Sequence, residues 1–487
     1  MRRRIDSATA CALGAALVLV ALATDARVAG AQSPLSRPSD AAKGVDFAAA
    51  TADVRRMLGE LVAADTTNPP GNEARAVAVG KKWLDEAGIP YQVFEFAPGR
   101  ENLVARLAGD GSAKPLLLLA HIDVVGTDGQ DWSTDPRTMV EQDGYLQARG
   151  VSDDLGMAAL ELEVLRLLKR AQVPLARDVI VAWTGDEESG GGGIRWLLEN
   201  APDAIAAEIA LNEGGGLRLD DQGRPKLIEL QAAEKTYQDF TITARGTTGH
   251  SSTPHGDNAI YRLAAALERL AKHTFPARML PVTRANFEAR AALEQPPLAN
   301  ALRKLAAAEG ELPADALEVI DRDPSLAATV RTTCVATLLE GGSRANALPA
   351  KATATVNCRI LPDETVEDVK RELERIIDDP KLEVAVVGEF GSGEPSPLDG
   401  AGPLAIRAVV EQMWPGLPIV PFMSRGATDS RYVRARGIPA YGINPIGLTE
   451  ADANRAHGVD ERIPVASLEP ALEFLYRLVV ELAAKKR

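Results

Sequence analysis

The stretch that decides the fold is LLLLAHID, residues 116–123. Four consecutive leucines, with no polar residue alternating with them, predict a strand that is buried on both faces. Two similar runs follow, VIVAWTG at 179–185 and EIAL at 208–211, and amphipathic helical stretches lie between them. Short apolar strands alternating with helices indicate an α/β fold with an open, mostly parallel sheet.

Polar side chains follow each of these strands. They are His121 and Asp123 after the first strand, Asp186, Glu187 and Glu188 after the second, and Asn212 and Glu213 after the third, with Asp153 and Asp154 in the glycine-flanked loop RGVSDDLG. In an open α/β sheet such groups gather in one crevice at the carboxyl ends of the strands. Each acid alone is more often a solvated surface residue. Unpaired carboxylates gathered in one crevice repel each other unless cations are present, so the pattern predicts a metal site.

The available donors limit the choice of metal. Imidazole and carboxylate ligands without thiolate suit zinc, cobalt or manganese. His457, in the loop AHGVDER before the last helix, could complete the site from the far end of the chain. Taken alone, it would be interpreted as a surface histidine.

Composition excludes several classes of protein. The chain is 46% hydrophobic and 25% charged, which is typical of a globular protein. Its 487 residues are too many for one compact core. The formal net charge of −14 makes nucleic acid a poor partner because an acidic protein repels phosphates.

The N-terminus resembles an export signal. Three arginines at 2–4 precede the apolar stretch 10–23, and Ala29-Gly30-Ala31 offers a cleavage site before Gln32. We therefore expect residues 1–31 to be a signal peptide, residues 32–44 to be a mobile leader, and the mature protein to be periplasmic or secreted with no membrane association. An uncleaved anchor is the alternative. Export would permit a disulfide between Cys334 and Cys358, although two buried free thiols are equally compatible with the sequence.

The pattern of elements changes near Thr236 and returns after Gly391. Between them the predicted order is strand-helix-strand-strand-helix-strand, a split βαβ unit with an irregular insert at about 275–325. We therefore predict a catalytic domain in two parts, 45–235 and 392–487, interrupted by a smaller α+β domain at 236–391.

Eight ordered motifs complete the pattern: AHIDVV, RGVSDD, TGDEESGG, LNEGG, GTTGHSSTPHGDNAI, NALPAKATATVNCRI, SRGATDSRYVR and AHGVDER. Together they resemble the metallopeptidase family that contains aminoacylase, carboxypeptidase G, yeast carboxypeptidase S and succinyl-diaminopimelate desuccinylase. The resemblance covers nearly the whole chain after the leader, and the long insert is most similar to the carboxypeptidase S branch.

The resemblance implies a site with two divalent metal ions, and zinc is the metal that we expect. By resemblance, Asp153 would bridge the metals, with His121 and Glu213 on one metal and Glu188 and His457 on the other. Glu187 would be the general base. Asp123 would hydrogen-bond the nitrogen of His121 that does not bind metal. One departure is Leu155, where related sequences usually have lysine in an Asp-Asp-Lys-Gly loop. That change bears on metal affinity and on the geometry of the loop.

The inserted domain would be the family's lid and dimerisation domain, giving a homodimer. By resemblance, His250 of a partner subunit would stabilise the oxyanion, and Asn346 and Arg359 would hold the carboxylate of the substrate. The remaining implied substrate contacts are Gly426, Thr428 and Asp429 in the glycine-rich loop 426–429.

These inferences predict an exported hydrolase that releases an amino acid with a free carboxylate, in the manner of a carboxypeptidase. An N-acyl-amino-acid amidohydrolase and a dipeptidase are alternatives within the family, and the substrate would be a small peptide or an N-acyl amino acid. A second family of two-zinc aminopeptidases has a similar order of ligands but lacks the inserted domain. A non-enzymatic binding protein on a degenerate peptidase fold is the alternative from a different class.

Overall fold

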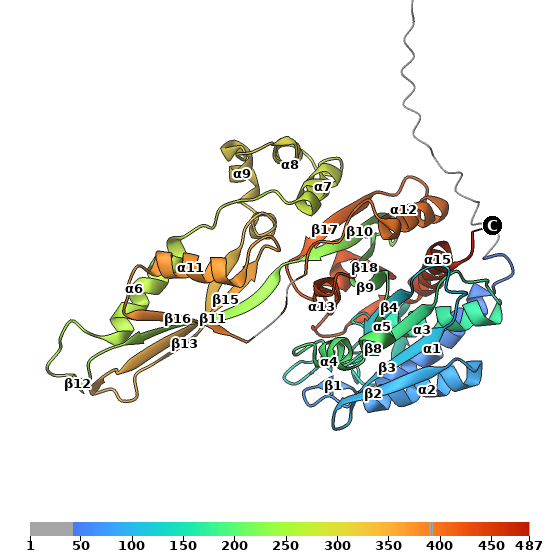
Figure 1. The fold of residues 1–487 in the computed structure, drawn as a ribbon, viewed down its shortest axis with the longest axis horizontal. Helices are drawn as coiled ribbons and strands as arrows, with labels where there is room; N and C mark the ends of the chain where they lie inside the picture. Colours follow the sequence, from blue (N-terminus) through green and yellow to red (C-terminus); the bar gives the residue numbers. More distant parts are fainter. Residues whose placement is uncertain (1–41, 389–390, 392, 487) are drawn as a thin grey trace, which may run out of the picture. The chain divides into compact units, whose positions relative to one another are not determined.

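The computed structural model describes residues 42–388, 391 and 393–486 (Figure 1). The expected signal peptide, 1–31, lies outside the described residues, as does the expected leader at 32–44 apart from a turn at 42–44. Within the described ranges, no helix is both long enough and apolar enough to cross a membrane.

An eight-stranded sheet forms the larger part of the fold, in the order β17-β10-β18-β9-β4-β8-β3-β2. Its strands are β2 (Tyr91–Ala97), β3 (Arg100–Leu107), β4 (Leu116–His121), β8 (Val179–Thr184), β9 (Ile209–Leu219), β10 (Pro225–Glu234), β17 (Ile419–Ser424) and β18 (Ala440–Leu448). Four of the neighbouring pairs are parallel, namely β17 with β10, β18 with β9, β9 with β4, and β4 with β8. The other three are antiparallel. The predicted open and mostly parallel α/β sheet is confirmed.

Helices cover both faces of this sheet. They are α1 (Phe47–Ala63), α2 (Ala74–Ala87), α3 (Leu155–Arg170), α4 (Gly192–Asn200), α5 (Pro202–Ile205), α12 (Ala401–Met413), α13 (Ser430–Ala435), α14 (Glu450–Ala453) and α15 (Val465–Ala483). All six residues of β4 are buried. Leu116 and Leu118 belong to one hydrophobic cluster and Leu117 and Leu119 to another. The consecutive leucines thus fill two cores, which explains why the strand lacks polar alternation.

Short strands complete the region around the main sheet. They are β1 (Thr67–Asn68), β5 (Val124–Val125), β6 (Val140–Gln142), β7 (Tyr145–Gln147) and β19 (Arg462–Pro464). The pairing of β19 with β7 joins the C-terminal segment to the segment before Asp153.

A second sheet has four strands in the order β13-β15-β11-β16. Its elements are β11 (Thr236–Arg245), α6 (Ala259–Lys272), β13 (Thr333–Gly341), β15 (Lys351–Ile360), α11 (Val366–Ile377) and β16 (Leu382–Val387), with the small pair β12 (Gly249–His250) and β14 (Ala347–Leu348). This is the predicted strand-helix-strand-strand-helix-strand order. Alternate residues of β15 are buried because α6 and α11 pack on one face of the sheet.

The insert between α6 and β13 is helical and has a core of its own. Its helices are α7 (Pro281–Arg290), α8 (Leu298–Ala307), α9 (Ala314–Ile320) and α10 (Pro324–Ala327). The side chain of Asn286 in α7 donates to the carbonyl of Pro421 in β17, at 2.8 Å. The insert therefore packs against the edge strand of the larger sheet.

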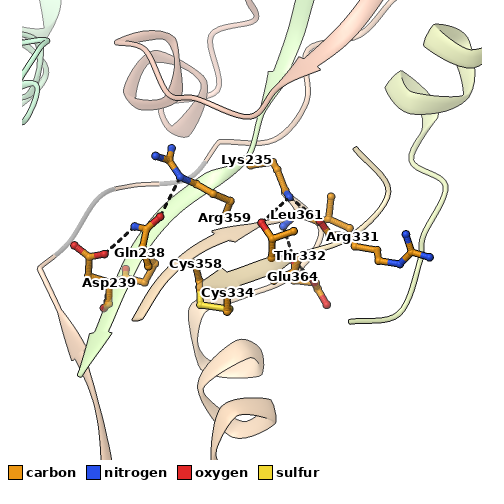
Figure 2. The surroundings of a disulfide bond; sticks show 12 residues. Lys235, Gln238, Asp239, Arg331, Thr332, Cys334, Cys358, Arg359, Leu361 and Glu364 are labelled. Atoms are coloured by element: carbon orange, nitrogen blue, oxygen red, sulfur yellow. Dashed lines mark hydrogen bonds between the residues drawn. A yellow bond between two sulfur atoms is a disulfide. The ribbon is translucent and has the colours of Figure 1, made fainter. Parts of the chain in front are cut away.

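The chain passes from the first sheet to the second at Lys235, between β10 and β11. Lys235 is buried, and its ammonium donates to the carbonyls of Ala328 and Arg331 at 2.9 and 2.6 Å. Burial lowers the pKa of Lys235 to about 7. Nearby, a disulfide joins Cys334 of β13 to Cys358, the residue opposite it on β15. Figure 2 shows this bond with Lys235 and Arg359 in its surroundings.

Candidate metal centre

Three neighbouring parallel strands bring the predicted ligands to one edge of the sheet. β4 ends at His121, the loop after β8 carries Glu187 and Glu188, and Glu213 lies on β9. The sequence predicts that this strand ends before Glu213, but in the structure β9 continues to Leu219. The pairing of β9 with β18 shifts register between Asn212 and Gly216. Glu213 therefore lies in an irregular part of the strand.

Two groups of potential metal ligands share one carboxylate, that of Asp153. The first group is His121, Asp153 and Glu213, and the second is Asp153, Glu188 and His457. Within each group the ligand atoms all lie within 4.8 Å of one another. The Nε2 atom of His121 lies 3.0 Å from one oxygen of Asp153, and Nε2 of His457 lies 3.1 Å from the other. The structure thus brings together the five residues that the resemblance implied as ligands.

The donors fit a pair of cations. Nδ1 of His121 lies 2.9 Å from the backbone carbonyl of Asp123, which can only accept, so this nitrogen carries the proton. Nε2 then faces a carboxylate oxygen of Asp153 at 3.0 Å, a contact that requires either a second proton on the ring or a metal cation between the two atoms. One oxygen of Glu188 is buried without a hydrogen-bond partner among the described residues. These features match a donor set that suits zinc, cobalt or manganese.

The ionisation of the ligands reflects their crowding. Burial raises the pKa of Asp153, but hydrogen bonds from His121 and His457 lower it more, and the net pKa is well below its usual range. Hydrogen bonds to Asp153 and Glu188 raise the pKa of His457 to about 10. Burial, followed by the charges of Asp153 and Glu187, holds the pKa of Glu213 well above normal. A cation would relieve this repulsion.

Glu187 lies beside the ligand groups but belongs to neither of them. Its backbone amide donates to Asp123 at 3.1 Å, and the amide of Glu188 donates to the same carboxylate at 3.2 Å. Burial raises the pKa of Glu187 well above normal, with Asp429 among the nearby charges that add to the effect. A carboxylate in this position is free to exchange a proton with a bound reactant.

The role predicted for Asp123 requires a correction. Its backbone carbonyl, and not its carboxylate, accepts from His121, and the nearer carboxylate oxygen lies 3.7 Å from Nδ1. The carboxylate instead accepts from the amides of Glu187 and Glu188 and from the side chain of Asn68, at 2.8 Å. The carboxylate aligns with these amides because the turn after β8 directs them toward the end of β4. Asp123 thus orients His121 with its backbone and the loop of Glu187 with its side chain.

Three further polar groups expected in the crevice belong to neither ligand group found among the described residues. Asp186 accepts from Arg100 at 2.8 Å and from Asn68 at 3.0 Å. Asn212 is buried and donates to Ser430 at 2.9 Å. Asp154 is buried without a close hydrogen-bond partner among the described residues. The expectation that all these groups form one crevice is therefore too broad for Asp186 and Asn212, because adjacent residues on a strand or turn point in different directions. Asp154 lies close enough to His121 and Asp153 for their charges to act on its pKa.

His250 and Asn346 lie in the second sheet region. His250 is exposed on β12 and its Nδ1 lies 2.7 Å from the hydroxyl of Ser252. Asn346 is exposed, and its carbonyl accepts from the amide of Ser251 at 3.1 Å. Neither residue belongs to the ligand groups found among the described residues. Their implied contacts with substrate therefore stay predictions.

Arg359 lies where β15 approaches the glycine-rich loop. It donates to the carbonyl of Arg425 at 3.3 Å and to the side chain of Asn357 at 3.3 Å, and its guanidinium stacks 4.6 Å from the ring centre of Tyr237. Burial lowers the pKa of Arg359. A half-buried guanidinium whose hydrogen-bond partners are neutral can still bind a carboxylate.

The residues of the glycine-rich loop differ from one another in exposure. Gly426 is exposed, and its amide donates to Ser424 at 3.1 Å. Thr428 is buried and donates to Glu234 through both its amide and its hydroxyl, at 2.7 Å each. Asp429 is buried and accepts from Thr184 at 2.7 Å, and burial raises its pKa to about 7. The exposed part of the loop is thus Gly426, while Thr428 and Asp429 hold the loop to the sheet.

The residues that support the site from behind were not identified from the sequence. Glu461 and Arg149 are both buried and form an ion pair at 2.7 Å behind Asp153. Asn68, in the turn TTNPPGNE, links Asp123 to Asp186. Glu461 lies in the same motif as His457, which was the only available signal in the sequence.

Comparisons with known proteins agree with this geometry. The sequence profile described as Peptidase family M20/M25/M40 matches residues 117–481. The human N-fatty-acyl-amino acid synthase/hydrolase PM20D1 is 31% identical over 76% of this chain and 74% of its own length. A probable carboxypeptidase S-like protein of Dictyostelium discoideum is 28% identical over 76% and 72%. Human aminoacylase-1 is 26% identical over 86% and 92%.

Solved structures show the same fold. The M20 family metallo-carboxypeptidase Sso-CP2 from Sulfolobus solfataricus matches with a TM-score of 0.68 and 18% identity, over 88% of this chain and 99% of its own. Human carnosine dipeptidase 1 matches with a TM-score of 0.61 and 16% identity, over 90% and 98%. The profile spans well over half of the chain, and the human relative above 30% identity covers about three quarters of it. The chain belongs to peptidase family M20/M25/M40, and it is a metallohydrolase of that family.

Proposed function

We propose that the protein is an exported two-metal amidohydrolase that releases an α-amino acid from an N-acyl amino acid. The observation that carries this proposal is the pair of ligand groups that share Asp153, with Glu187 beside them and outside both. Two divalent cations held there, with zinc the first choice, would polarise a carbonyl and lower the pKa of a water molecule.

The residues of the chain divide the remaining work. Glu187 accepts a proton from the attacking water and passes it to the leaving nitrogen. His121 is fixed in one tautomer by the carbonyl of Asp123, and the turn that carries Glu187 is fixed by the carboxylate of the same residue. Arg359 offers two parallel donors to a carboxylate of the substrate, which favours substrates with a free acid next to the scissile amide. His250, supplied by a partner subunit, would donate to the oxyanion.

Relatives favour the N-acyl substrate over the peptide. The PM20D1 relative at 31% identity is named for N-fatty-acyl amino acids, and aminoacylase-1 is also among the relatives. The Dictyostelium relative at 28% is named as a probable carboxypeptidase, so a peptide with a free carboxyl end is the second candidate. Both substrate types present the same amide and the same carboxylate, and they differ only on the acyl side.

A hydrolysis panel with metal analysis tests the proposal. The panel contains N-dodecanoyl, N-acetyl and dipeptide derivatives of one amino acid, and the released amino acid is measured. We expect faster release from the N-acyl substrates, loss of activity after chelation, and recovery with zinc, cobalt or manganese. Full activity in a preparation verified to be free of metal would contradict the two-metal site. Binding of these compounds without turnover by the metal-loaded protein would support the binding-protein alternative instead.

Export has a separate test. The basic residues at 2–4 and the apolar stretch 10–23 support a cleaved signal. We expect the mature protein recovered from its native host to begin at Gln32, as determined by N-terminal mass spectrometry. An intact N-terminus in a membrane fraction would indicate an anchor.

A further inference from the structure

Glu461 is a buried carboxylate that lies four residues after His457 in the same loop. Its side chain accepts five hydrogen bonds from residues 149–153, the segment that carries Asp153. Oε1 accepts from the amide and hydroxyl of Ser152, at 2.8 and 2.9 Å, and from the amide of Asp153 at 3.2 Å. Oε2 accepts from the amide of Gly150 at 3.0 Å and from Arg149 at 2.7 Å. A single side chain thus holds the backbone from Gly150 to Asp153, the residue that carries the shared carboxylate.

The same contact network reaches the backbone of His457. The second guanidinium nitrogen of Arg149 donates to the carbonyl of Gly458 at 3.0 Å and to the side chain of Gln130 at 2.9 Å. Gln130 in turn donates to the carbonyl of His457 at 2.9 Å. The two loops that carry Asp153 and His457 are therefore joined through half-buried contacts of Arg149 and one exposed contact of Gln130.

The two ligand groups depend on these loops to different degrees. In the first group, His121 and Glu213 lie on β4 and β9, two strands of the main sheet that pair directly with each other. In the second group, His457 has a left-handed backbone, with φ of +61°, and a side chain that is 54% exposed. Little packing holds the ring of His457, so its position relative to Asp153 depends on the loop.

We propose that Glu461 is a positioning residue that sets the geometry between Asp153 and His457 and thereby selectively supports the second metal position. The inference rests on the proposed two-metal function. Removing the carboxylate leaves four N–H or O–H donors and the Arg149 cation without their acceptor, so the loop of Asp153 must move or admit water. The ligand group that spans both loops loses more than the group fixed by the sheet.

Glu461→Gln is the test variant, because either orientation of the amide turns an NH2 group toward existing donors. Asp460→Asn is the matched control in the adjacent position. One oxygen of Asp460 accepts from the amide and hydroxyl of Ser133, both at 2.9 Å, and from Gln147 at 3.1 Å. An asparagine oxygen can accept the same bonds, and none of them involves the segment 149–153.

The experiment is a stepwise titration of the metal-free mature protein with Co²⁺, followed by visible absorption and calorimetry. It is performed at a temperature at which circular dichroism shows every variant to be folded. We expect wild type and Asp460→Asn to bind two ions per subunit. Glu461→Gln should bind the first ion normally and the second about 10- to 100-fold more weakly, the usual cost of losing an outer contact of a metal ligand. The visible absorption spectrum of the second bound Co²⁺ should also differ from that of wild type.

Other outcomes separate this inference from the proposed function. A Glu461→Gln protein that binds both ions as wild type does, or that loses both steps equally, would overturn the selective positioning role. If that variant does not fold, Ser152→Ala removes one donor to Glu461 and decides the question, with a weaker second step supporting the role and an unchanged one overturning it. Failure of the wild type to bind two ions would contradict the two-metal function itself.

Discussion

At the scale of single residues, Leu155 marks a departure from the pattern of related sequences, which usually have lysine there. Its side chain is 1% exposed and packs in the main hydrophobic core, close to Gly150. The candidate metal ligands come together without a cation at 155, because Glu461 and Arg149 fix the loop of Asp153. The substitution therefore affects the core beneath the loop more directly than the ligands.

Glu187 and Glu188 are adjacent residues with different expected roles. Glu188 belongs to a ligand group and lies 3.1 Å from His457, whereas Glu187 belongs to neither group. We expect Glu187→Gln to keep its metal and lose at least about 10²-fold in kcat, the usual contribution of a general base. Glu188→Gln should lower the metal content. Metal analysis and steady-state kinetics on both variants check this, and the opposite pattern would reverse the assignment.

Glu161 is a buried acid on α3 that belongs to neither ligand group found among the described residues. Its side chain is fully buried and neither oxygen has a close hydrogen-bond partner among the described residues. Burial, and then the charge of Asp154, raises its pKa well above the ordinary 4.5. The folded state therefore keeps a proton that the unfolded state releases above pH 4.5, and the free energy of unfolding falls as pH rises through this window.

Glu161→Leu should remove this penalty. We expect the variant to have a higher Tm than wild type at pH 8 and a much smaller difference near pH 4, measured by thermal unfolding at both pH values. Glu199→Leu, which replaces an exposed acid on α4, is the control. That change should not give a Tm difference that grows between pH 4 and pH 8. A Glu161→Leu effect that is equal at both pH values would show that packing and not ionisation is responsible.

At the scale of elements, the sequence predicted the strands whose residues are uniformly apolar. β4 and β8 are buried along their whole length, and their ends place His121, Glu187 and Glu188 where expected. β10 and β17 were not anticipated. β10 mixes lysine, glutamate and glutamine with apolar residues, and β17 contains Pro421, which an edge strand can accommodate.

Side-chain partners were harder to predict than strand ends. The partner of His121 is a carbonyl of Asp123 because the backbone turns immediately after β4. Asn212 faces away from Glu213, its neighbour on the same strand. Glu461 could not be found because its role depends on segments more than 300 residues apart. Spacing in the sequence identifies the donors, while their partners depend on the packing of distant loops.

Arg359 links β15 to the carbonyl of Arg425, which directly precedes the glycine-rich loop. If Arg359 binds the carboxylate of the substrate, Arg359→Ala should lower kcat/KM on a free-acid substrate. The loss of transition-state stabilisation should be about 2 kcal/mol or more, because a charge-assisted pair is removed. On the matching amide the loss should be small. Arg375→Ala, which removes an exposed arginine paired with Glu372 on α11, is the control and should affect neither substrate. Equal losses on acid and amide would assign Arg359 to structure.

At the scale of the whole molecule, the second sheet leaves an apolar edge uncovered. β13 is an edge strand, and Val335, Leu338 and Leu339 on it are 61%, 66% and 68% exposed. Tyr261 on the neighbouring helix α6 is 72% exposed. Exposed apolar edge strands tend to pair with another chain, so we propose that this edge joins two copies of the protein into a homodimer.

The proposed dimer would have consequences for both assembly and catalysis. Leu339→Lys should convert the proposed dimer to a monomer in light scattering, because a charge would be buried at the edge, whereas Arg371→Ala, at an exposed position of α11, should not. If His250 acts on the site of its partner, the monomer should also lose activity while keeping both metals.

Mixing two inactive variants tests the contribution of His250 directly. After Glu187→Gln and His250→Ala subunits exchange, half of the dimers contain one copy of each. In such a dimer one site combines an intact Glu187 with an intact partner's His250, so about a quarter of the wild-type activity should return. His250 is exposed and outside the ligand groups of its own subunit, as action on a partner requires. No recovery in a mixture shown to contain mixed dimers would mean that His250 acts within its own subunit or has no part in catalysis.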